Sequence, residues 1–323
     1  MTTATLIPRF TDEPLSEIIQ VLQGLSLTQD MLEFEVLNPD LYEAHLFNGE
    51  EVMVFERAHR HRHYQTWLDL AQSLGHVFLT PQVDPELSPY IRLRFRRIGE
   101  RGWHTSSLPS GHPEKYGAQS LFARLHKSEE PYFLKHFQES LRWIGVDTTT
   151  RILSLGVNSG DELALSVAHL EPNLRAVTPA GHWVGVDHSA SAIESARQRY
   201  PQPQFEWVVG DLSELDALAL GIFDLVICLN TLQSSLIDEQ RELKRWVKSY
   251  LSERGALILS FPQSRYVGTQ QLYGDHSFHT LYPKPSKTFK LLTSFQRYLQ
   301  QHGFAVNIRG KYTLFLIAKK LMK

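Results

Sequence analysis

The sequence predicts an α/β protein with a smaller α+β domain at its N-terminus. From Arg151 onward, apolar strand patterns alternate with helix patterns, which is typical of a mostly parallel, doubly wound sheet with helices on both faces. Seven such strands can be counted, and the last two, GFAVNIR and KYTLFLIAKK, meet at a short turn around Gly310 and predict a C-terminal antiparallel hairpin. At 323 residues the chain is also long for a single domain. We therefore expect an accessory domain over residues 1–105, a linker with lid helices over 106–150 and the α/β domain over 151–323.

The expected accessory domain contains two helices and four strand patterns. TDEPLSEIIQVLQGL predicts a helix that ends at Gly24, and YQTWLDLAQSLGH predicts a second helix that stops at Gly75. Strands are expected in MLEFEVLN, EEVMVFER, HVFLTPQV and YIRLRFRRI. In the last of these, apolar residues alternate with arginines, so one face of the strand is apolar and the other cationic. The cationic face is either a solvated edge or a phosphate-binding surface, and Arg94 and Arg96 are candidate substrate contacts on it.

Charge is distributed unevenly along a chain whose net charge is only −2. Residues 1–56 carry eleven acids against Arg9, whereas residues 281–323 carry nine Lys and Arg and no acid. Further basic clusters lie in RAHRHRH and IRLRFRRIGER. The basic stretches favour RNA or another polyanion as a partner, while the acidic start and the near-neutral total favour a small molecule or a protein.

Cysteine, histidine and hydropathy patterns exclude several other classes of protein. Cys228 is the single cysteine and lies in the apolar run FDLVICL, so we expect a core residue and no disulfide. The histidines near residue 60 have no accompanying metal-ligand spacing, and we expect no metal. Neither a leader pattern nor a membrane-spanning apolar run is apparent, so we expect a cytoplasmic protein without a membrane partner.

Two helical stretches are expected between the linker and the α/β domain. RGWHTSSLPSGHPEKYG concentrates Ser, Pro and Gly and is the expected linker. The helical patterns SLFARLHKSEE and PYFLKHFQESLRWIG follow it and are separated at Pro131. The second repeats four apolar residues on one face, namely Phe133, Phe137, Leu141 and Ile144. Helices at this position can cover the site that follows.

The α/β domain opens with RILSLGVNSGDELALS, which predicts a buried strand, a glycine-bracketed loop and a helix N-terminus. Such a turn binds the polar part of a nucleotide-like ligand, although glycines at this place also serve simple packing. Further polar residues end the next three strands, HWVGVD, FEWVVGD and FDLVICLN; they are Asp187, Asp211 and Asn230. In an open α/β sheet these strand ends lie on one rim, where ligands bind.

The combination of these motifs over residues 151–323 resembles the class I S-adenosylmethionine-dependent methyltransferases. LSLGVNSGD resembles the glycine loop of that family, VGVD its ribose-binding acid, and VVGDL its adenine-contacting turn. The resemblance implies that Gly156 and Gly160 contact the methionine part, Asp187 the ribose, and Asp211 with Leu212 the adenine. It extends the candidate cofactor contacts to Leu155, Asn158, Asp161, His188 and Asn230.

This chain departs from the family pattern at two loop positions. The family usually has an acid where this chain has Ser154, so Asp161 or the backbone is expected to hold the methionine amino group instead. The family usually has a middle glycine where this chain has Asn158, and Asn is a residue that tolerates a left-handed backbone. Two other classes remain open: a nicotinamide-dependent oxidoreductase, which would not explain Asp211 or the hairpin, and a non-catalytic protein that kept the cofactor fold.

The resemblance implies methyl transfer, an in-line displacement at a sulfonium that rests largely on positioning, with a base where the acceptor is a hydroxyl or an acidic N–H. Candidate catalytic residues are His276, His279 and Asn230. Tyr273 and Asp275 belong to the same insertion after the fifth strand and are candidate substrate contacts. We expect RNA or another nucleic acid as the acceptor, with small-molecule O- or N-methylation as the alternative.

Overall fold

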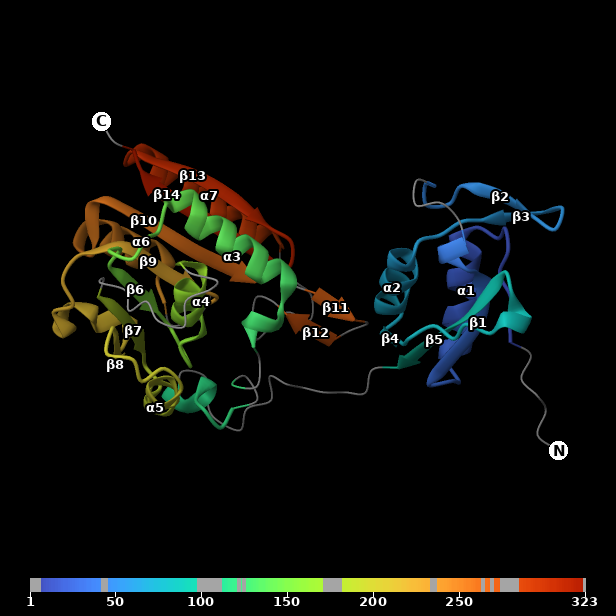
Figure 1. The fold of residues 1–323 in the computed structure, drawn as a ribbon, viewed down its shortest axis with the longest axis horizontal. Helices are drawn as coiled ribbons and strands as arrows, with labels where there is room; N and C mark the ends of the chain where they lie inside the picture. Colours follow the sequence, from blue (N-terminus) through green and yellow to red (C-terminus); the bar gives the residue numbers. More distant parts are fainter. Residues whose placement is uncertain are drawn as a thin grey trace. The chain divides into compact units, whose positions relative to one another are not determined.

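The computed structural model describes residues 7–41, 46–97, 112–120, 123, 126–170, 182–232, 237–262, 265–267, 270–273 and 285–321, with backbone only between 262 and 287. The chain divides into two compact units (Figure 1). One comprises residues 1–102 with 266–272, and the other comprises residues 103–265 with 273–323. We call them the N-terminal unit and the α/β unit.

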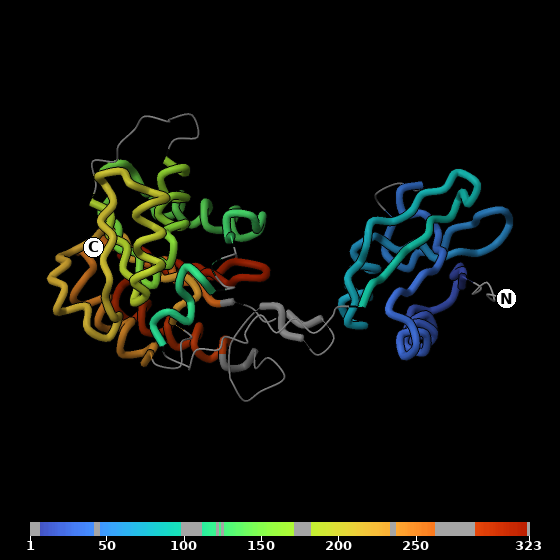
Figure 2. Tube along the Cα trace, turned by 90° about the horizontal axis from the view of Figure 1, so that it is seen from below, coloured from blue at the N-terminus to red at the C-terminus, as the bar shows by residue number. Residues whose placement is uncertain are grey.

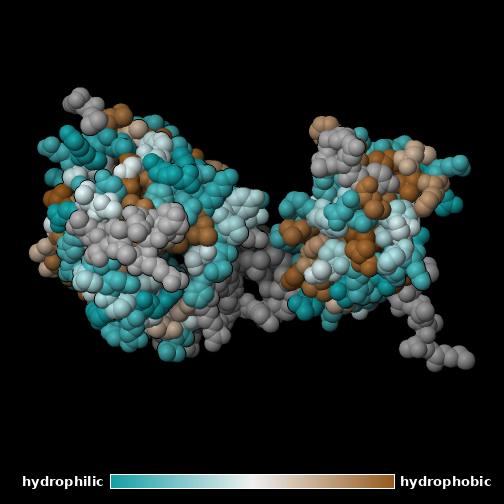
Figure 3. Space-filling model, viewed as in Figure 1, coloured by the Kyte–Doolittle hydropathy of each residue, from teal (hydrophilic) through white to brown (hydrophobic). Residues whose placement is uncertain are grey.

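The N-terminal unit is built on a three-stranded antiparallel sheet in the order β1-β5-β4. Its strands are β1 (Met31–Leu37), β4 (His76–Phe78) and β5 (Tyr90–Arg97), and a hairpin is formed by β2 (Glu51–Val54) and β3 (Arg57–Arg60). The helices are α1 (Leu15–Ser26) and α2 (Tyr64–Ser73), with short 3₁₀ turns η1 (Pro39–Leu41) and η2 (Pro85–Leu87). The surface mixes exposed apolar and polar side chains (Figure 3), and Leu27, Phe47, Met53 and Phe55 are among the exposed apolar ones.

Two expectations for this unit were wrong. Helix α1 continues past Gly24 to Ser26, because a single glycine lowers helix stability without preventing helical geometry. The pattern EEVMVFER is not one strand: Phe55 and Glu56 both have positive φ, 47° and 61°, and form the turn between β2 and β3. The turn lacks the Gly or Asn that usually signals a two-residue hairpin, so the alternation pattern continued across it.

Strand β5 has the two faces that its alternation predicts. Ile91, Leu93 and Phe95 are fully buried in the core of the unit. On the other face, Arg92 Nη2 lies 3.1 Å from Glu35 Oε1, and Arg94 is paired across the sheet with Glu33. Acidic residues of β1 therefore stand opposite two of the arginines.

The α/β unit is organised around a seven-stranded sheet in the order β13-β14-β10-β9-β6-β7-β8. Its strands are β6 (Ile152–Leu155), β7 (Trp183–Asp187), β8 (Phe205–Val209), β9 (Phe223–Leu229), β10 (Leu251–Pro262), β13 (Phe304–Gly310) and β14 (Thr313–Lys320). The five strands from β10 to β8 are parallel, and β14 is antiparallel to both β10 and β13. The mostly parallel sheet and the C-terminal hairpin are thus confirmed.

Helices cover both faces of this sheet (Figures 1 and 2), as the doubly wound prediction requires. One face is covered by α3 (Pro131–Ile144), α4 (Asp161–Leu170) and α5 (Ala190–Arg199). The other face is covered by η6 (Leu212–Leu218), α6 (Glu239–Ser249) and α7 (Pro285–Gln301). Short strands β11 (Arg265–Val267) and β12 (Gln270–Tyr273) pair with each other after β10.

The segment before the first strand of the sheet differs from its expected structure. In SLFARLHKSEE, the described residues have 3₁₀ conformation at Ala123 and in the turn η5 (Lys127–Glu129), where a helix was expected. Helix α3 begins at Pro131 as predicted, and Phe133 and Phe137 pack on Phe315 of β14 with ring centroids 5.3 and 6.4 Å apart. Helix α3 therefore covers a face of the sheet, and a second 3₁₀ turn, η3 (Pro113–Tyr116), is nearer to the loop after β6.

Candidate functional site

The loop after β6 follows the path that its glycines make possible. Gly156 has a φ of 70°, and its N–H donates to the Val186 carbonyl of β7 over 2.8 Å. A Cβ on Gly156 would lie 2.3 Å from Thr231 Oγ1, so a side chain there would collide with the chain after β9. Asn158 has a φ of 45°, which confirms the left-handed conformation expected of it. Gly160 (φ 87°) completes the turn into α4.

Asp187, the last residue of β7, holds this loop through hydrogen bonds of its carboxylate. Its Oδ2 accepts from the Asn158 backbone N–H over 2.8 Å, and its Oδ1 accepts from the Ser189 N–H over 2.9 Å. His188 Nδ1 lies 3.4 Å from the same Oδ1, and the Asp187 residue is only 6% exposed. A carboxylate has about four acceptor positions, so two such bonds leave capacity for a diol.

The ends of β8 and β9 supply the remaining polar groups of the rim. Asp211 caps η6, where Oδ1 accepts from the backbone N–H and the hydroxyl of Ser213, both over 2.7 Å. These bonds hold the pKa of Asp211 below its usual value. Leu212 beside it is buried in the core. Asn230 has a φ of 53°, and its Oδ1 accepts from the Ser260 hydroxyl over 3.0 Å.

Beneath the loop lies a buried polar pair that the sequence analysis did not identify. The Ser154 hydroxyl donates to Glu162 Oε1 over 3.0 Å, and the two residues are 0% and 9% exposed. Burial raises the pKa of the Glu162 carboxyl to about 8. Asp161 is turned elsewhere, toward Arg199 Nη1 at 3.0 Å and the Tyr200 hydroxyl at 3.2 Å.

The segment around η3 is fastened to this site, and we call residues 113–118 the strap. The Glu114 carboxylate accepts from the hydroxyls of Ser189 and Ser191 at the start of α5. The Tyr116 carbonyl accepts from the Asn158 side-chain amide over 2.8 Å. Gly117 lies close to this carboxylate: a Cβ there would lie 2.1 Å from Glu114 Oε2, so any larger residue would displace the Glu114 side chain.

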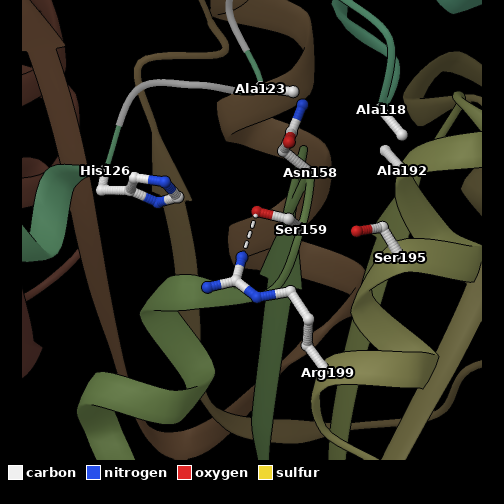
Figure 4. Close-up of a pocket in the computed structure, with 8 residues that line it drawn as sticks. All are labelled: Ala118, Ala123, His126, Asn158, Ser159, Ala192, Ser195 and Arg199. Atoms are coloured by element: carbon white, nitrogen blue, oxygen red, sulfur yellow. Dashed lines mark hydrogen bonds between the residues drawn. The ribbon is translucent and has the colours of Figure 1, made fainter.

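A cavity of about 240 Å³ lies on one side of the loop (Figure 4). It is lined by loop residues, by one face of α5 and by the chain just after the strap; the lining residues are Ala118, Ala123, His126, Asn158, Ser159, Ala192, Ser195 and Arg199. Arg199 points back to the loop and donates to the Ser159 hydroxyl over 3.1 Å. The cavity is smaller than the roughly 300 to 1,000 Å³ of ordinary ligand pockets.

The other predicted site residues fall into three groups. Leu155 is fully buried, so only its backbone borders the loop. Arg94 and Arg96 belong to the N-terminal unit. Tyr273 ends β12 with only its backbone described, and Asp275, His276 and His279 lie outside the described residues.

The structure also bears on three features considered in the sequence, namely a metal site, a membrane-spanning segment and the single cysteine. In the described ranges, no group of three or more His, Cys, Asp or Glu side chains could hold a metal ion. No helix among the described residues has the length and apolar character needed to cross a membrane. Cys228 is fully buried, as expected of a core residue, and burial raises the pKa of its thiol.

Sequence reasoning missed Glu162 and Glu114 for different reasons. An acid in the first turn of a helix is expected to interact with the helix dipole, which gave no reason to single out Glu162. It lies one residue before buried Leu163 and four before buried Ser166, a spacing that indicates the inner face of α4. Glu114 lies in a stretch with a linker composition, and its partners Ser189 and Ser191 are about 75 residues away in sequence. Only the fold brings those groups together.

Comparisons with known proteins agree with this geometry. Residues 152–255 match the family model described as a methyltransferase domain. Two relatives, the 2-phytyl-1,4-naphtoquinone methyltransferases of Trichormus variabilis and a Nostoc species, are each 38% identical over 80 residues. That stretch is 24% of this chain and 32% of each relative, so the chain spans about a third of the length of these relatives.

Parts of this chain also align with solved structures of methyltransferases. The methyltransferase CalH, in complex with SAH, has a TM-score of 0.43 and 19% identity over 62% of this chain and 63% of that one. Magnesium protoporphyrin IX methyltransferase from Synechocystis, with bound SAM, has a TM-score of 0.36 and 20% identity over 58% and 79%. What the comparisons establish for this chain is the match of residues 152–255 to a methyltransferase domain.

Proposed function

We propose that this protein transfers the methyl group of S-adenosylmethionine to a small-molecule acceptor. The observation that carries the proposal is the junction of Asp187 with the glycine loop, within residues that match the methyltransferase domain. Backbone N–H groups, a buried carboxylate and a helix N-terminus meet there, which suits a ligand with a ribose and a charged amino acid.

The residues of the rim fit the parts of this cofactor. Gly156 is held in a positive-φ conformation with Thr231 packed against its α-carbon, so the loop follows a path that a larger residue could not adopt. Asp187 keeps acceptor positions for the two ribose hydroxyls, and the loop fixes its orientation through the Asn158 N–H. Asp211 with Leu212 stands at the next strand end, where an adenine would be held. These assignments are part of the proposal.

The bound cofactor supplies an activated methyl group on a sulfonium. The protein's contribution is to align the acceptor with that group and to exclude water, since an in-line displacement depends mostly on geometry. The strap supports this role, because it is tied both to the loop and to the start of α5. Asn230 at the end of β9 and the histidines His276 and His279 are the proposed groups that orient the acceptor or take its proton.

A small-molecule acceptor is favoured over the nucleic acid that the sequence analysis put first. The relatives at 38% identity are named for a naphthoquinone substrate. On the cationic face of β5, Arg92 forms an ion pair with Glu35, and Arg94 lies opposite Glu33 in the strand register. An ion pair and a facing acid reduce the positive charge that this strand offers to a polyanion.

Two assays test the proposal. Calorimetric titration with S-adenosylmethionine is expected to show binding, and Asp187→Asn is expected to weaken it by roughly 10- to 100-fold through loss of charged hydrogen bonds. Glu206→Gln, an exposed acid on β8, is the matched control and should bind normally. In the second assay, label from [methyl-³H]-S-adenosylmethionine should pass to a small-molecule fraction of a cell extract.

Other outcomes would point to the other classes of function. Label found only in RNA would overturn the small-molecule acceptor and restore the nucleic-acid prediction. Binding of S-adenosylmethionine without transfer to any fraction would favour a non-catalytic cofactor-binding protein. Binding of NADH alone would exclude the proposed cofactor.

A further inference from the structure

The pair formed by Ser154 and Glu162 places a carboxyl group directly beneath the glycine loop. Ser154 lies in β6, two residues before Gly156, and Glu162 lies in the first turn of α4, two residues after Gly160. Their side chains meet over 3.0 Å across the base of the loop. The carboxyl group is therefore held at a fixed place by the two elements that form the loop.

The described residues that act most strongly on Glu162 do not include a balancing positive charge. The charged groups that act on it most are the carboxylates of Asp161 and Asp187, and both disfavour its ionised form. The Tyr200 hydroxyl and the Cys228 thiol also interact with it, and burial raises the pKa of each. The Ser154 hydroxyl and the Glu162 backbone N–H favour ionisation only weakly against this burial. A buried carboxyl group without a cation stays protonated near neutral pH.

A cation that enters at the loop would change this balance. The proposed cofactor carries two positive centres, its sulfonium and the ammonium of its methionine part. We propose that Glu162 is a cofactor-recognition residue that gives up its proton on binding, with its carboxylate, oriented by Ser154, as the counter-charge to the ammonium. This inference rests on the proposed function and adds a residue and a coupled proton to it.

Asp161, the residue that the sequence analysis put forward for this task, is less suited to it. Its carboxylate already pairs with Arg199 at 3.0 Å and accepts from Tyr200, and His126 lies 3.9 Å away. A cationic ligand would have to compete with an arginine for it. Glu162 has no such competitor in the contacts described, so a ligand ammonium gains more from it.

The proposal fixes the direction of the pH dependence. Below about pH 8, the free protein carries a proton on Glu162 that the complex has lost. Affinity therefore rises with pH up to that value, by at most about tenfold per unit. The α-amino group of the ligand titrates near pH 7.7 to 8.0, so the effect is cleanest at pH 6.0 to 7.0.

The test is isothermal titration of the full chain with S-adenosylmethionine at pH 6.5, in two buffers with different ionisation enthalpies. The wild type should release roughly one proton per ligand bound, and Glu162→Gln should release none. His188 and His126, which lie near Asp187 and Asp161, are both retained in the variant, so any proton that they exchange cancels in the comparison. His126→Gln is a further control and should release as many protons as the wild type.

A shortened ligand separates recognition from a purely structural role. 5′-Methylthioadenosine has the adenosine part but lacks the amino acid, so Glu162→Gln should leave its affinity unchanged. For S-adenosylmethionine at pH 7.0, the same variant should bind about tenfold or more weakly. A structural defect of the loop would weaken both ligands together.

The outcomes separate this inference from the proposed function. If the folded wild type does not bind S-adenosylmethionine, the proposed function itself fails. If it binds, but Glu162→Gln releases the same number of protons as the wild type, then Glu162 is not the group coupled to the ligand. Equal weakening of both ligands by Glu162→Gln would likewise overturn recognition of the ammonium.

Discussion

Glu162 has a second consequence at the scale of a single residue, because a raised pKa in the folded state also affects stability. The folded protein keeps this proton up to about pH 8, whereas the unfolded chain loses it near 4.5. Between those values the folded state binds more protons, so its stability falls as pH rises. Glu162→Gln cannot lose a proton, so we expect it to stabilise the ligand-free α/β unit relative to the wild type at pH 8. The gain should be about 1.4 kcal/mol for each unit by which the pKa of Glu162 in the folded protein exceeds its pKa in the unfolded chain.

Chemical denaturation of wild type and variant at pH 5, 6.5 and 8 measures this effect. The two proteins should be similar at pH 5 and should diverge as pH rises. Ser166→Ala, which alters a buried residue of the same helix without a titrating group, is the control and should show no such divergence. A constant difference between wild type and Glu162→Gln over this range would contradict the raised pKa.

Single residues were predictable where their function depends on the local sequence. Asn158 was expected to adopt a left-handed conformation, and Asp187 was expected at a strand end beside the loop; both lie as predicted. The buried pair of Ser154 and Glu162 could not be found in the same way. It depends on the packing of α4 against β6, which directs the Glu162 side chain inward.

At the scale of an element, the strap should be held closed mainly by Glu114. Its carboxylate accepts from Ser189 and Ser191 at the N-terminus of α5, where a negative charge is also favoured by the helix dipole. Glu114→Gln removes the charge and weakens these bonds. A charged hydrogen bond contributes about 1.5 to 3 kcal/mol, so the strap should open more often in the variant. Trypsin can cleave after Lys115 only while the strap is open, and we therefore expect this cleavage to be at least roughly tenfold faster.

Mass spectrometry of short digests identifies that cleavage among the other tryptic sites. Glu129→Gln neutralises a neighbouring exposed acid in η5 and serves as the matched control. Ser191→Ala should increase cleavage in the same way as Glu114→Gln. Equal cleavage rates for Glu114→Gln and the control would mean that the strap is held by its other contacts, such as the bond from Asn158 to the Tyr116 carbonyl.

Helices and strands were predicted best where their apolar residues are regularly spaced. All seven strands of the large sheet and the helices from α3 to α7 follow from their apolar spacing, because one or both faces of each element are buried. The β2–β3 hairpin was missed because its turn is made by Phe55 and Glu56. The strap was assigned to a linker because its structure depends on partners in α5 and in the glycine loop.

At the scale of the whole molecule, the segmental charge asymmetry of the sequence was a weaker guide to the acceptor than expected. Acids and bases that are far apart along the chain meet within the N-terminal unit. Glu35 pairs with Arg9 and Arg92, and Asp30 pairs with Arg97 at 2.9 Å. Counts along the sequence cannot detect this pairing, since it depends on the register of β1 against β5.

The two units should unfold in separate steps, because the described residues of each unit form an apolar core of their own. Ile91 is fully buried in the N-terminal unit, and Ile227 is fully buried in the α/β unit. An Ile→Val change costs about 0.5 to 1.5 kcal/mol. We therefore expect Ile91→Val to lower only one calorimetric transition, by roughly 4 to 8 °C per kcal/mol, and Ile227→Val to lower only the other.

S-Adenosylmethionine provides the complementary measurement in the same calorimetric experiment. At a concentration of 100 times its dissociation constant, a ligand stabilises the unit that binds it by about 2.7 kcal/mol. This should raise only the transition that Ile227→Val lowers, because the glycine loop and Asp187 both belong to the α/β unit. A single transition that both substitutions and the ligand move equally would show instead that the two units unfold as one cooperative structure.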